Sequence, residues 1–307
     1  MTANFLFVSD DNYVKNLGVC TYSLMHNTCP HADNVRMFVM DCGITDASKE
    51  KLIAQTKRFD NAEIIFYDIN SLLDEVVPKV ENHWHRAIYG RLFLNKILEK
   101  YEGIDRIIYL DCDIIVNQPI IELFEIDLQG KCIGGVIDGD NTVRLKALNI
   151  KGEIYINSGV LVIDTKRWVE LDAGKRIIEY INNYPDKLVY PDQDAINCVL
   201  CDELAIIPLQ YNFFWCICER DIPKIKKYLD IPYSEDDIFY AFHNIKIMHY
   251  AGHNMWSMFG ITPTPTKIFK KYKNLSDWRK CRRKYYSLHD FVLGVLVNIK
   301  RFILRDI

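Results

Sequence analysis

Short apolar runs rich in β-branched residues alternate with helix-like stretches through the first 250 residues. The apolar runs predict strands at Phe5–Val8, Val35–Val39, Glu63–Tyr67, Arg106–Leu110, Ile133–Val136, Tyr155–Ile163, Leu204–Ile207 and Ile245–Met248. The stretches between them predict helices at Gly18–His26, Ser48–Phe59, Ala87–Lys100, Leu171–Asn183 and Asp192–Leu200. This alternation is typical of an α/β fold whose mainly parallel sheet carries helices on both faces.

Polar residues follow three of the predicted strands. They are Ser9-Asp10-Asp11-Asn12-Tyr13, Asp111-Cys112-Asp113 and His249-Tyr250-Ala251-Gly252-His253. Ligands of such sheets bind outside the carboxyl ends of the strands, so these residues are candidates for a binding site. No G-x-G-x-x-G follows a strand and no G-x-x-x-x-G-K-[ST] occurs, so the phosphate-binding loops of dinucleotide-binding and P-loop proteins are excluded.

The pair Asp111 and Asp113 is a candidate cation site. Alternate residues of an extended segment project to the same side, so both carboxylates can reach one ion. Oxygen ligands suit Mg²⁺ or Mn²⁺, and a third ligand from His249 shifts the preference toward Mn²⁺. A bare D-x-D also occurs where acidic residues only cap a helix or face water. The apolar strand Ile107–Leu110 that ends at the pair favours the metal site.

Two further polar clusters have both a binding and a structural interpretation. The segment Ser9–Tyr13 offers a carboxylate and an amide for a base edge and an aromatic ring for stacking, or it is a polar loop with an Asx turn. Asn157-Ser158-Gly159 and Asp192-Gln193-Asp194 can hydrogen-bond sugar hydroxyls, or they form a turn and a helix N-cap. The residues alone leave these alternatives open.

Composition places the chain among soluble globular proteins. It has 307 residues, 38 Lys+Arg against 41 Asp+Glu and a hydrophobic fraction of 49%, which excludes intrinsic disorder and rod-like folds. The first residues lack the basic segment and cleavage site of a signal peptide, so the ten scattered cysteines are expected to be reduced thiols in a cytoplasm. Cys198-x-x-Cys201 and Cys216-x-Cys218 approach zinc-ligand spacing, but their apolar surroundings favour buried structural cysteines.

The order of several motifs resembles glycosyltransferase family 8. In chain order the motifs are V-S-D-D-N-Y, Y-G-R-L near Arg91, I-I-Y-L-D-C-D-I-I-V, I-N-S-G-V-L-V-I-D, P-D-Q-D and H-Y-A-G. The similarity spans about residues 4–256. This family contains retaining galactosyl- and glucosyltransferases, including bacterial lipopolysaccharide galactosyltransferases, and its fold is a GT-A-type Rossmann-like α/β domain. The resemblance therefore implies a nucleotide-sugar catalytic domain, assigned to residues 1–266.

The resemblance also implies a role for each matching residue. The uridine of a UDP-sugar donor would be held by Val8, Asp10, Asn12 and Tyr13, with the ring of Tyr13 stacked on uracil. Mn²⁺, or alternatively Mg²⁺, would bridge the diphosphate to Asp111, Asp113 and His249. The donor sugar would lie among Arg91, Asp138, Asn157, Asp192 and Gln193, with Gly252 in the donor-binding set. Gln193 occupies the position of the family's disputed nucleophile.

The implied reaction is Mn²⁺-dependent transfer of galactose or glucose to a cell-surface glycan or glycolipid. A side-chain amide such as that of Gln193 is a poor nucleophile, so we expect front-face attack by the acceptor, with the leaving phosphate oxygen taking its proton. Double displacement would instead need a carboxylate at the anomeric carbon, from Asp192 or Asp138.

One motif departs from the family pattern. The family reads H-x-x-G-x-x-K-P-W, whereas this chain reads H-Y-A-G-H-N-M-W from His249 to Trp256. The missing lysine normally reaches the diphosphate, and its loss removes a point charge there. His253 or a lysine elsewhere could replace it. Without a replacement, transfer is weakened, donor choice is altered, or the protein binds nucleotide without turnover.

The last part of the chain, residues 267–307, is basic and aromatic, with twelve Lys/Arg against three Asp/Glu. An apolar stripe at helical spacing consists of Leu288, Phe291, Val292, Val295, Ile299, Phe302 and Ile303. A basic amphipathic helix suits an anionic membrane surface, which predicts peripheral contact with the inner face of the membrane. The alternative is a packed helix with a solvated basic face. No nucleic-acid motif accompanies the tail. A chain ending at Thr266 is expected to stay active on soluble acceptors and to lose liposome binding.

Two other function classes compete with the transferase. A haloacid-dehalogenase-like phosphatase also has a D-x-D after an apolar strand and binds Mg²⁺, but the later lysine and distal acidic pair that it needs do not form a full set here. A non-catalytic UDP-sugar-binding protein would account for the missing lysine. UDP release distinguishes both from a transferase.

Overall fold

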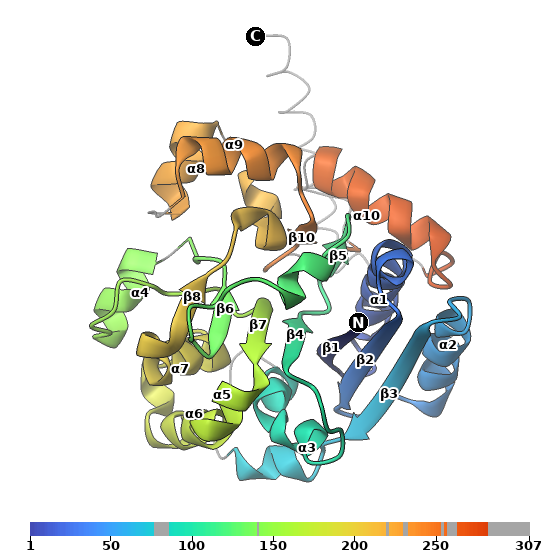
Figure 1. Cartoon of the computed structure of the whole chain (residues 1–307), viewed down its shortest axis with the longest axis horizontal. Helices are drawn as coiled ribbons and strands as arrows, with labels where there is room; N and C mark the ends of the chain where they lie inside the picture. The colour runs from blue at the N-terminus through green and yellow to red at the C-terminus, as the bar shows by residue number, and fades with distance from the viewer. Residues whose placement is uncertain are drawn as a thin grey trace, which may run out of the picture.

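The computed structural model describes residues 1–76, 86–139, 141–218, 221–229, 233–252, 255–256 and 263–281. Its main sheet has seven strands in the order β3-β2-β1-β4-β7-β6-β8 (Figure 1). The strands are β1 (Thr2–Ser9), β2 (Asn34–Asp41), β3 (Ala62–Asp68), β4 (Arg106–Leu110), β6 (Ile133–Gly135), β7 (Val160–Asp164) and β8 (Leu204–Ile206). Strand β7 runs antiparallel to β4 and β6, and the other neighbours are parallel. The predicted α/β fold with a mixed, mainly parallel sheet is confirmed.

A second, small sheet contains β5 (Ile114–Val116), β10 (Ile247–His249) and β9 (Phe213–Phe214), in the order β5-β10-β9. The predicted strand Ile245–Met248 belongs to this sheet rather than to the main one, which corrects the sequence interpretation. Strands β5 and β9 were not predicted, because two or three residues are too few to show an alternating pattern. Strand β10 is antiparallel to β5 and parallel to β9.

The predicted strand Tyr155–Ile163 is also shorter than expected, because β7 begins only at Val160. Ile156 forms an isolated bridge with Ile137. The segment between Ile156 and β7 turns instead of continuing the strand, and the side chain of Asn157 accepts a hydrogen bond from the backbone N–H of Gly159 (3.0 Å). The polar residues of this segment therefore lie at the end of the sheet and not within it.

Helices cover both faces of the main sheet (Figure 1). The described α-helices are α1 (Val14–Thr28), α2 (Asp46–Thr56), α3 (Asn95–Leu98), α4 (Asn141–Leu148), α5 (Thr165–Glu170), α6 (Ala173–Asn183), α7 (Pro191–Val199), α8 (Ile222–Leu229), α9 (Glu235–His243) and α10 (Pro263–Leu275). Short 3₁₀ helices lie at Cys29–His31, Leu72–Glu75, Arg86–Phe93, Ile121–Phe124, Pro185–Lys187, Cys201–Glu203, Leu209–Asn212 and Trp215–Ile217.

One predicted helix is divided in the structure and another is shorter than predicted. The stretch Ala87–Lys100 forms the 3₁₀ helix Arg86–Phe93 followed by the single turn of α3. Gly90, in the middle of this stretch, lowers its preference for a regular α-helix. The stretch Leu171–Asn183 contains only α6, which begins after Asp172, a residue with a left-handed backbone (φ 48°).

The core has two parts, one on each face of the sheet. Side chains of successive strand residues point to opposite faces, so Phe5 and Phe7 of β1 join one cluster while Leu6 joins the other. Helices α1, α2 and α10 contribute to the first cluster, and α3, α5, α6 and α7 contribute to the second. The sheet is therefore buried on both faces, and a binding site is expected at the ends of its strands, which the helices do not cover.

Helix α10 runs across residue 266, where the sequence interpretation divides the chain. It packs on α1, and Phe269, Tyr272 and Trp278 are buried in the first core cluster. The described part of the basic tail thus belongs to the packing of the domain. Residues 282–307, with the predicted apolar stripe, lie outside the described residues. None of the described helices has the length and apolar character that a membrane-spanning segment requires.

Candidate functional site

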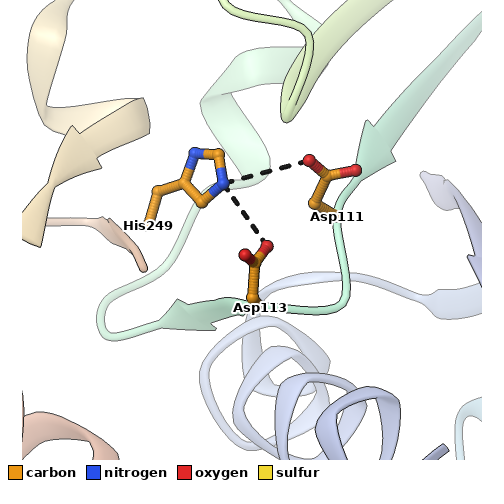
Figure 2. A group of neighbouring side chains, drawn as sticks. All are labelled: Asp111, Asp113 and His249. Carbon is orange, nitrogen blue, oxygen red and sulfur yellow. Dashed lines mark ion pairs between the residues drawn. The ribbon is translucent and has the colours of Figure 1, made fainter. Parts of the chain in front are cut away.

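Strand pairing brings the three predicted metal ligands together. Asp111 and Asp113 follow the buried strand β4, and the pairing of β5 with β10 sets His249 opposite Ile114. The backbone N–H of Tyr250 donates to the carbonyl of Asp113 (3.0 Å) and fixes this arrangement. Figure 2 shows the imidazole of His249 directing Nε2 toward both carboxylates, 3.4 Å from Oδ1 of Asp113 and 3.9 Å from Oδ2 of Asp111.

The donor set of this cluster fits a small divalent cation. One candidate ligand atom from each residue lies within 4.8 Å of the others. Burial disfavours the charged imidazolium of His249, but Asp113 and Asp111 outweigh it and raise the pKa of His249 above its ordinary value. A cation bound there would compete with that proton. Two carboxylate oxygens and one imidazole nitrogen are ligands that suit Mn²⁺, and Mg²⁺ with less preference.

Close approach of the backbone makes Gly159 part of this cluster. Its carbonyl accepts a hydrogen bond from the N–H of Asp111 (2.8 Å). A Cβ atom at this position would lie 2.3 Å from Cε1 of His249 and 2.9 Å from Oδ2 of Asp111. Both neighbours are predicted metal ligands, so no side chain fits there without displacing them.

We expect Gly159→Ala to weaken Mn²⁺ binding by at least about tenfold. Losing a hydrogen bond that only orients a metal ligand already lowers metal affinity by about 10–100-fold, and displacing the ligands themselves should cost no less. Titration of free Mn²⁺ followed by electron paramagnetic resonance measures this change. Gly152→Ala is the matched control, since a Cβ there would meet its nearest atom at 3.7 Å. Equal Mn²⁺ affinity of the two variants would contradict the prediction.

Arg91 connects the predicted metal site to Asp192. The buried guanidinium pairs with Oδ1 of Asp111 (3.1 Å) and Oδ2 of Asp192 (3.3 Å), and donates to the carbonyl of Ser158 (2.7 Å). It lies over the ring of Tyr109, 4.0 Å from the centroid. Burial raises the pKa of Asp192, and Arg91 counteracts part of this effect. A desolvated cation thus lies between two carboxylates of the site.

Three predicted sugar-binding residues form one hydrogen-bonded cluster. Nδ2 of Asn157 donates to Oδ2 of Asp138 (2.9 Å) and to Oε1 of Gln193 (3.1 Å). Nε2 of Gln193 donates to the same Asp138 oxygen (3.2 Å) and to the hydroxyl of Tyr155 (3.0 Å), while its Oε1 also accepts from the N–H of Ser158 (3.0 Å). All four hydrogen-bonding positions of the Gln193 amide are therefore occupied by the protein.

The loop after β1 supplies the N-terminal part of the site. The N–H of Tyr13 donates to Oδ1 of Asp10, three residues earlier in the same loop (3.0 Å). Nδ2 of Asn12 donates to Oδ2 of Asp10 (3.0 Å). Tyr13, the residue predicted to stack on a base, is 54% exposed.

A cavity of about 460 Å³ joins these groups. It is lined by predicted site residues from each cluster: Val8, Asp10, Tyr13, Arg91, Asp111, Asp113, Asp138, Asn157, Asp192, Gln193, His249 and Gly252. Asn12 is the predicted residue that does not line it. Gly252 has φ +68°, a left-handed backbone that glycine adopts readily. Lining residues that sequence reasoning did not single out include Gly139, Tyr190 and Phe214.

Asn212 is a buried polar residue beside His249 that sequence reasoning missed. It lies at the end of a short 3₁₀ helix outside every motif, and its Oδ1 is 2.8 Å from Nδ1 of His249. No local signal marks it, because its partner is distant in the sequence.

The cysteines take no part in a metal site within the described chain. All ten are free, and the His/Cys/Asp/Glu group with metal-ligand spacing is Asp111, Asp113 and His249. The zinc-like pairs at Cys198, Cys201, Cys216 and Cys218 are half-buried rather than fully buried, which corrects the expectation of buried cysteines.

The lysine that the family pattern has after Gly252 is missing from this chain. Among the described residues, no other lysine lines the cavity in its place. Trp256, at the end of the altered motif, is buried and donates from Nε1 to Oδ1 of Asn16. The ammonium groups of Lys15 and Lys273 lie 5.1 and 5.4 Å from its ring centroid. His253, the other candidate replacement, lies outside the described residues.

Comparison with known proteins gives a consistent family. General stress protein A of Bacillus subtilis is 33% identical over 207 residues, which cover 66% of this chain and 71% of that protein. The lipopolysaccharide 1,2-glucosyltransferase of Escherichia coli K12 is 24% identical over 317 residues, covering 96% and 89%. The crystal structure of the galactosyltransferase LgtC with donor and acceptor sugar analogues shares the fold, with a TM-score of 0.70, 23% identity and coverage of 90% and 96%.

The family comparison decides between the enzyme classes. Residues 4–256 match Glycosyl transferase family 8, which agrees with the span of the motifs and excludes the haloacid-dehalogenase-like alternative. The GT-A-type fold expected from the resemblance is likewise confirmed by the architecture and by the structural likeness. The chain is a glycosyltransferase and belongs to glycosyltransferase family 8.

Proposed function

We propose that this protein transfers galactose or glucose from a UDP-sugar to a cell-surface glycan or glycolipid, with retention of anomeric configuration and with Mn²⁺ as the cofactor. Mg²⁺ is the alternative ion. The observation that supports this proposal most directly is that one cavity is lined by the Asp111–Asp113–His249 cluster, by Tyr13 and by the amide cluster around Gln193. These are the groups that a diphosphate-bound cation, a base and a sugar require, in one continuous space.

The donor would lie along this cavity. The ring of Tyr13 would stack on uracil, and Asp10 and the backbone of Val8 would contact the uridine. Asn12 would act through Asp10, to which it donates a hydrogen bond, because it does not line the cavity. The sugar would reach Asp138 and Asp192. Gly252 would approach the donor through its backbone.

Breaking the anomeric C–O bond places negative charge on the leaving UDP. A divalent cation held by Asp111, Asp113 and His249 supplies Lewis-acid stabilisation of that charge when it is bound. Arg91 holds Asp111 and Asp192 at fixed positions, so the two carboxylates need not reorganise during the reaction. The protein therefore contributes a rigid set of charges around the leaving group.

The hydrogen bonds of Gln193 support front-face attack. Its amide oxygen already accepts two hydrogen bonds and points to Ser158 and Asn157, so it has no lone pair directed at an anomeric carbon. In this scheme the acceptor hydroxyl attacks on the leaving-group side, the C–O bond to UDP breaks, and a phosphate oxygen takes the hydroxyl proton. Double displacement would require Asp192 or Asp138 to form the glycosyl bond.

Acceptor and location are inferred from the relatives and the tail. Two relatives are named lipopolysaccharide 1,2-glucosyltransferases, so we propose a lipid-linked or cell-surface acceptor of that class. Such an acceptor is consistent with a cytoplasmic protein at the inner face of the membrane. The net charge of residues 267–307 supports binding to anionic lipid headgroups, which stays a prediction.

Release of UDP from UDP-galactose, UDP-glucose and UDP-N-acetylglucosamine, measured with Mn²⁺ and with EDTA, tests the proposal. We expect release from one hexose donor, with loss of at least about 100-fold on chelation, because the cation stabilises the leaving group. Metal-dependent UDP binding without release, even with lipopolysaccharide acceptors, would instead identify a non-catalytic UDP-sugar-binding protein. Release that is insensitive to EDTA would contradict the metal assignment.

A further inference from the structure

Asn212 joins the predicted metal cluster to the amide cluster. Its side chain is fully buried and makes one hydrogen bond at each end. Its Oδ1 lies 2.8 Å from Nδ1 of His249, and its Nδ2 donates to Oδ1 of Asn157 (2.9 Å). This buried amide has one orientation, because the backbone N–H of Gly159 donates to Oδ1 of Asn157 and so fixes the atom facing Asn212 as an acceptor. Nδ2 of Asn212 must therefore point to Asn157 and Oδ1 to His249.

This orientation determines the tautomer of His249. Because Oδ1 of Asn212 can only accept, Nδ1 of His249 must carry the hydrogen of that contact. The unprotonated nitrogen of the neutral ring is then Nε2, which faces Asp111 and Asp113. A ring held in this tautomer presents its lone pair to the position between the carboxylates.

Asn212 and the backbone of Gly159 together hold the side chain of Asn157 in one orientation. Oδ1 of Asn157 accepts from Asn212 and from the N–H of Gly159 (3.0 Å), so its Nδ2 must face Asp138 and Gln193. Through this amide the orientation set at Asn212 extends to the oxygen of Asp138 that receives hydrogen bonds from both Asn157 and Gln193.

We propose that Asn212 is a positioning residue with two separable effects: it presents His249 to the metal and it orients the Asn157–Gln193–Asp138 cluster toward the sugar. The proposal rests on the metal site and the donor site of the proposed function. Asn212 touches neither ion nor donor in this scheme, and it acts through His249 on one side and Asn157 on the other.

The first effect is tested by metal binding without any donor. Asn212→Ala removes the acceptor for Nδ1, and we expect Mn²⁺ affinity to fall 10–100-fold, as for other outer contacts of metal-ligating histidines. The readout is the free Mn²⁺ signal in electron paramagnetic resonance. Asn61→Ala is the matched control, because Nδ2 of Asn61 also makes hydrogen bonds within the protein, to the carbonyls of Cys29 and Ala32. Asn61 lies at the amino end of β3, whereas the site lies beyond the carboxyl end of β4, at the opposite edge of the sheet.

The second effect is tested by Asn212→Asp, which keeps an oxygen for Nδ1 of His249 and removes the donor to Asn157. The added carboxylate would attract Nδ2 of Asn157 and draw that amide away from Asp138. We expect Mn²⁺ affinity at least as strong as in the wild type, together with a fall in kcat of about tenfold or more. A residue with a merely structural role would not separate these two measurements.

Four results would contradict the proposal or the metal site on which it rests. Wild-type affinity for Mn²⁺ in folded Asn212→Ala would overturn the effect on His249, and wild-type kcat in Asn212→Asp would overturn the effect on Asn157. Should Asn212→Ala fail to fold, Asn212→Asp tests both, because weaker Mn²⁺ binding there contradicts the acceptor role. If the wild-type protein itself does not bind Mn²⁺, the proposed function fails and not this inference alone.

Discussion

Replacing Asp113 with asparagine should reduce UDP release by more than about 100-fold while leaving the fold intact. Removing a residue that only orients a metal ligand lowers metal affinity or activity by about 10–100-fold. The carboxylate of Asp113 is a predicted direct ligand, so its loss should lower activity further. The change removes one negative charge and keeps the size of the side chain. Of the two carboxylates, Asp113 is the cleaner target, because Asp111 also binds Arg91 and the hydroxyl of Tyr109.

Steady-state UDP release at saturating Mn²⁺, together with thermal unfolding, measures the effect of Asp113→Asn. Asp186→Asn is the matched control, since this exposed residue lies in the short 3₁₀ helix Pro185–Lys187, outside the cavity lining. A midpoint of unfolding close to that of the wild type is expected for both variants. Full activity of Asp113→Asn would remove the metal site from the proposed mechanism.

The parts of the site that the sequence predicts are those that depend on contiguous residues. The apolar strand β4 runs directly into Asp111 and Asp113, so the position of the pair at a strand end can be read locally. The motif around Asn157 and the start of α7 at Pro191 are equally local. Their convergence in one cavity is predicted by the carboxyl-end rule together with the family resemblance.

The parts that the sequence does not predict depend on pairings between distant segments. His249 is predicted as a ligand, but the pairing of β5 with β10 that brings it to Asp113 is not, because the three residues of β5 are too few to show a periodic pattern. Asn212 lies outside every motif, and its role follows from contacts with His249 and Asn157, each more than thirty residues away. Local sequence patterns do not predict contacts between segments that are far apart in the chain, so a structure is needed to find them.

Ending the chain at Thr266 should prevent stable folding, contrary to the expectation from charge and composition alone. The deleted segment includes Phe269, Tyr272 and Trp278, all buried in the core. Removing a buried phenylalanine or tryptophan side chain costs about 3–5 kcal/mol, so the three together cost on the order of 10 kcal/mol. This is comparable to the whole stability of a typical domain, about 5–15 kcal/mol.

Polar contacts of the same segment add to this loss. The hydroxyl of Tyr272 donates to the carbonyl of Asn117 (3.0 Å) and accepts from Asn27 (2.9 Å). The indole of Trp278 occupies the space that a side chain at Gly18 would need, and the ammonium group of Lys51 lies 3.9 Å from its ring centroid. Helix α1 begins directly after Tyr13 and would lose its cover along this face.

A chain ending at Cys281 is the matched comparison, because it retains every described residue of the tail. We expect it to unfold at about the temperature of the full chain and to release UDP at the same rate, whereas the chain ending at Thr266 should be unfolded or aggregated. A cooperative unfolding transition of the shorter chain near that of the full chain would contradict this. Because residues 267–281 belong to the packing of the domain, a loss of liposome binding reports on the basic tail only when the full chain is compared with the chain ending at Cys281.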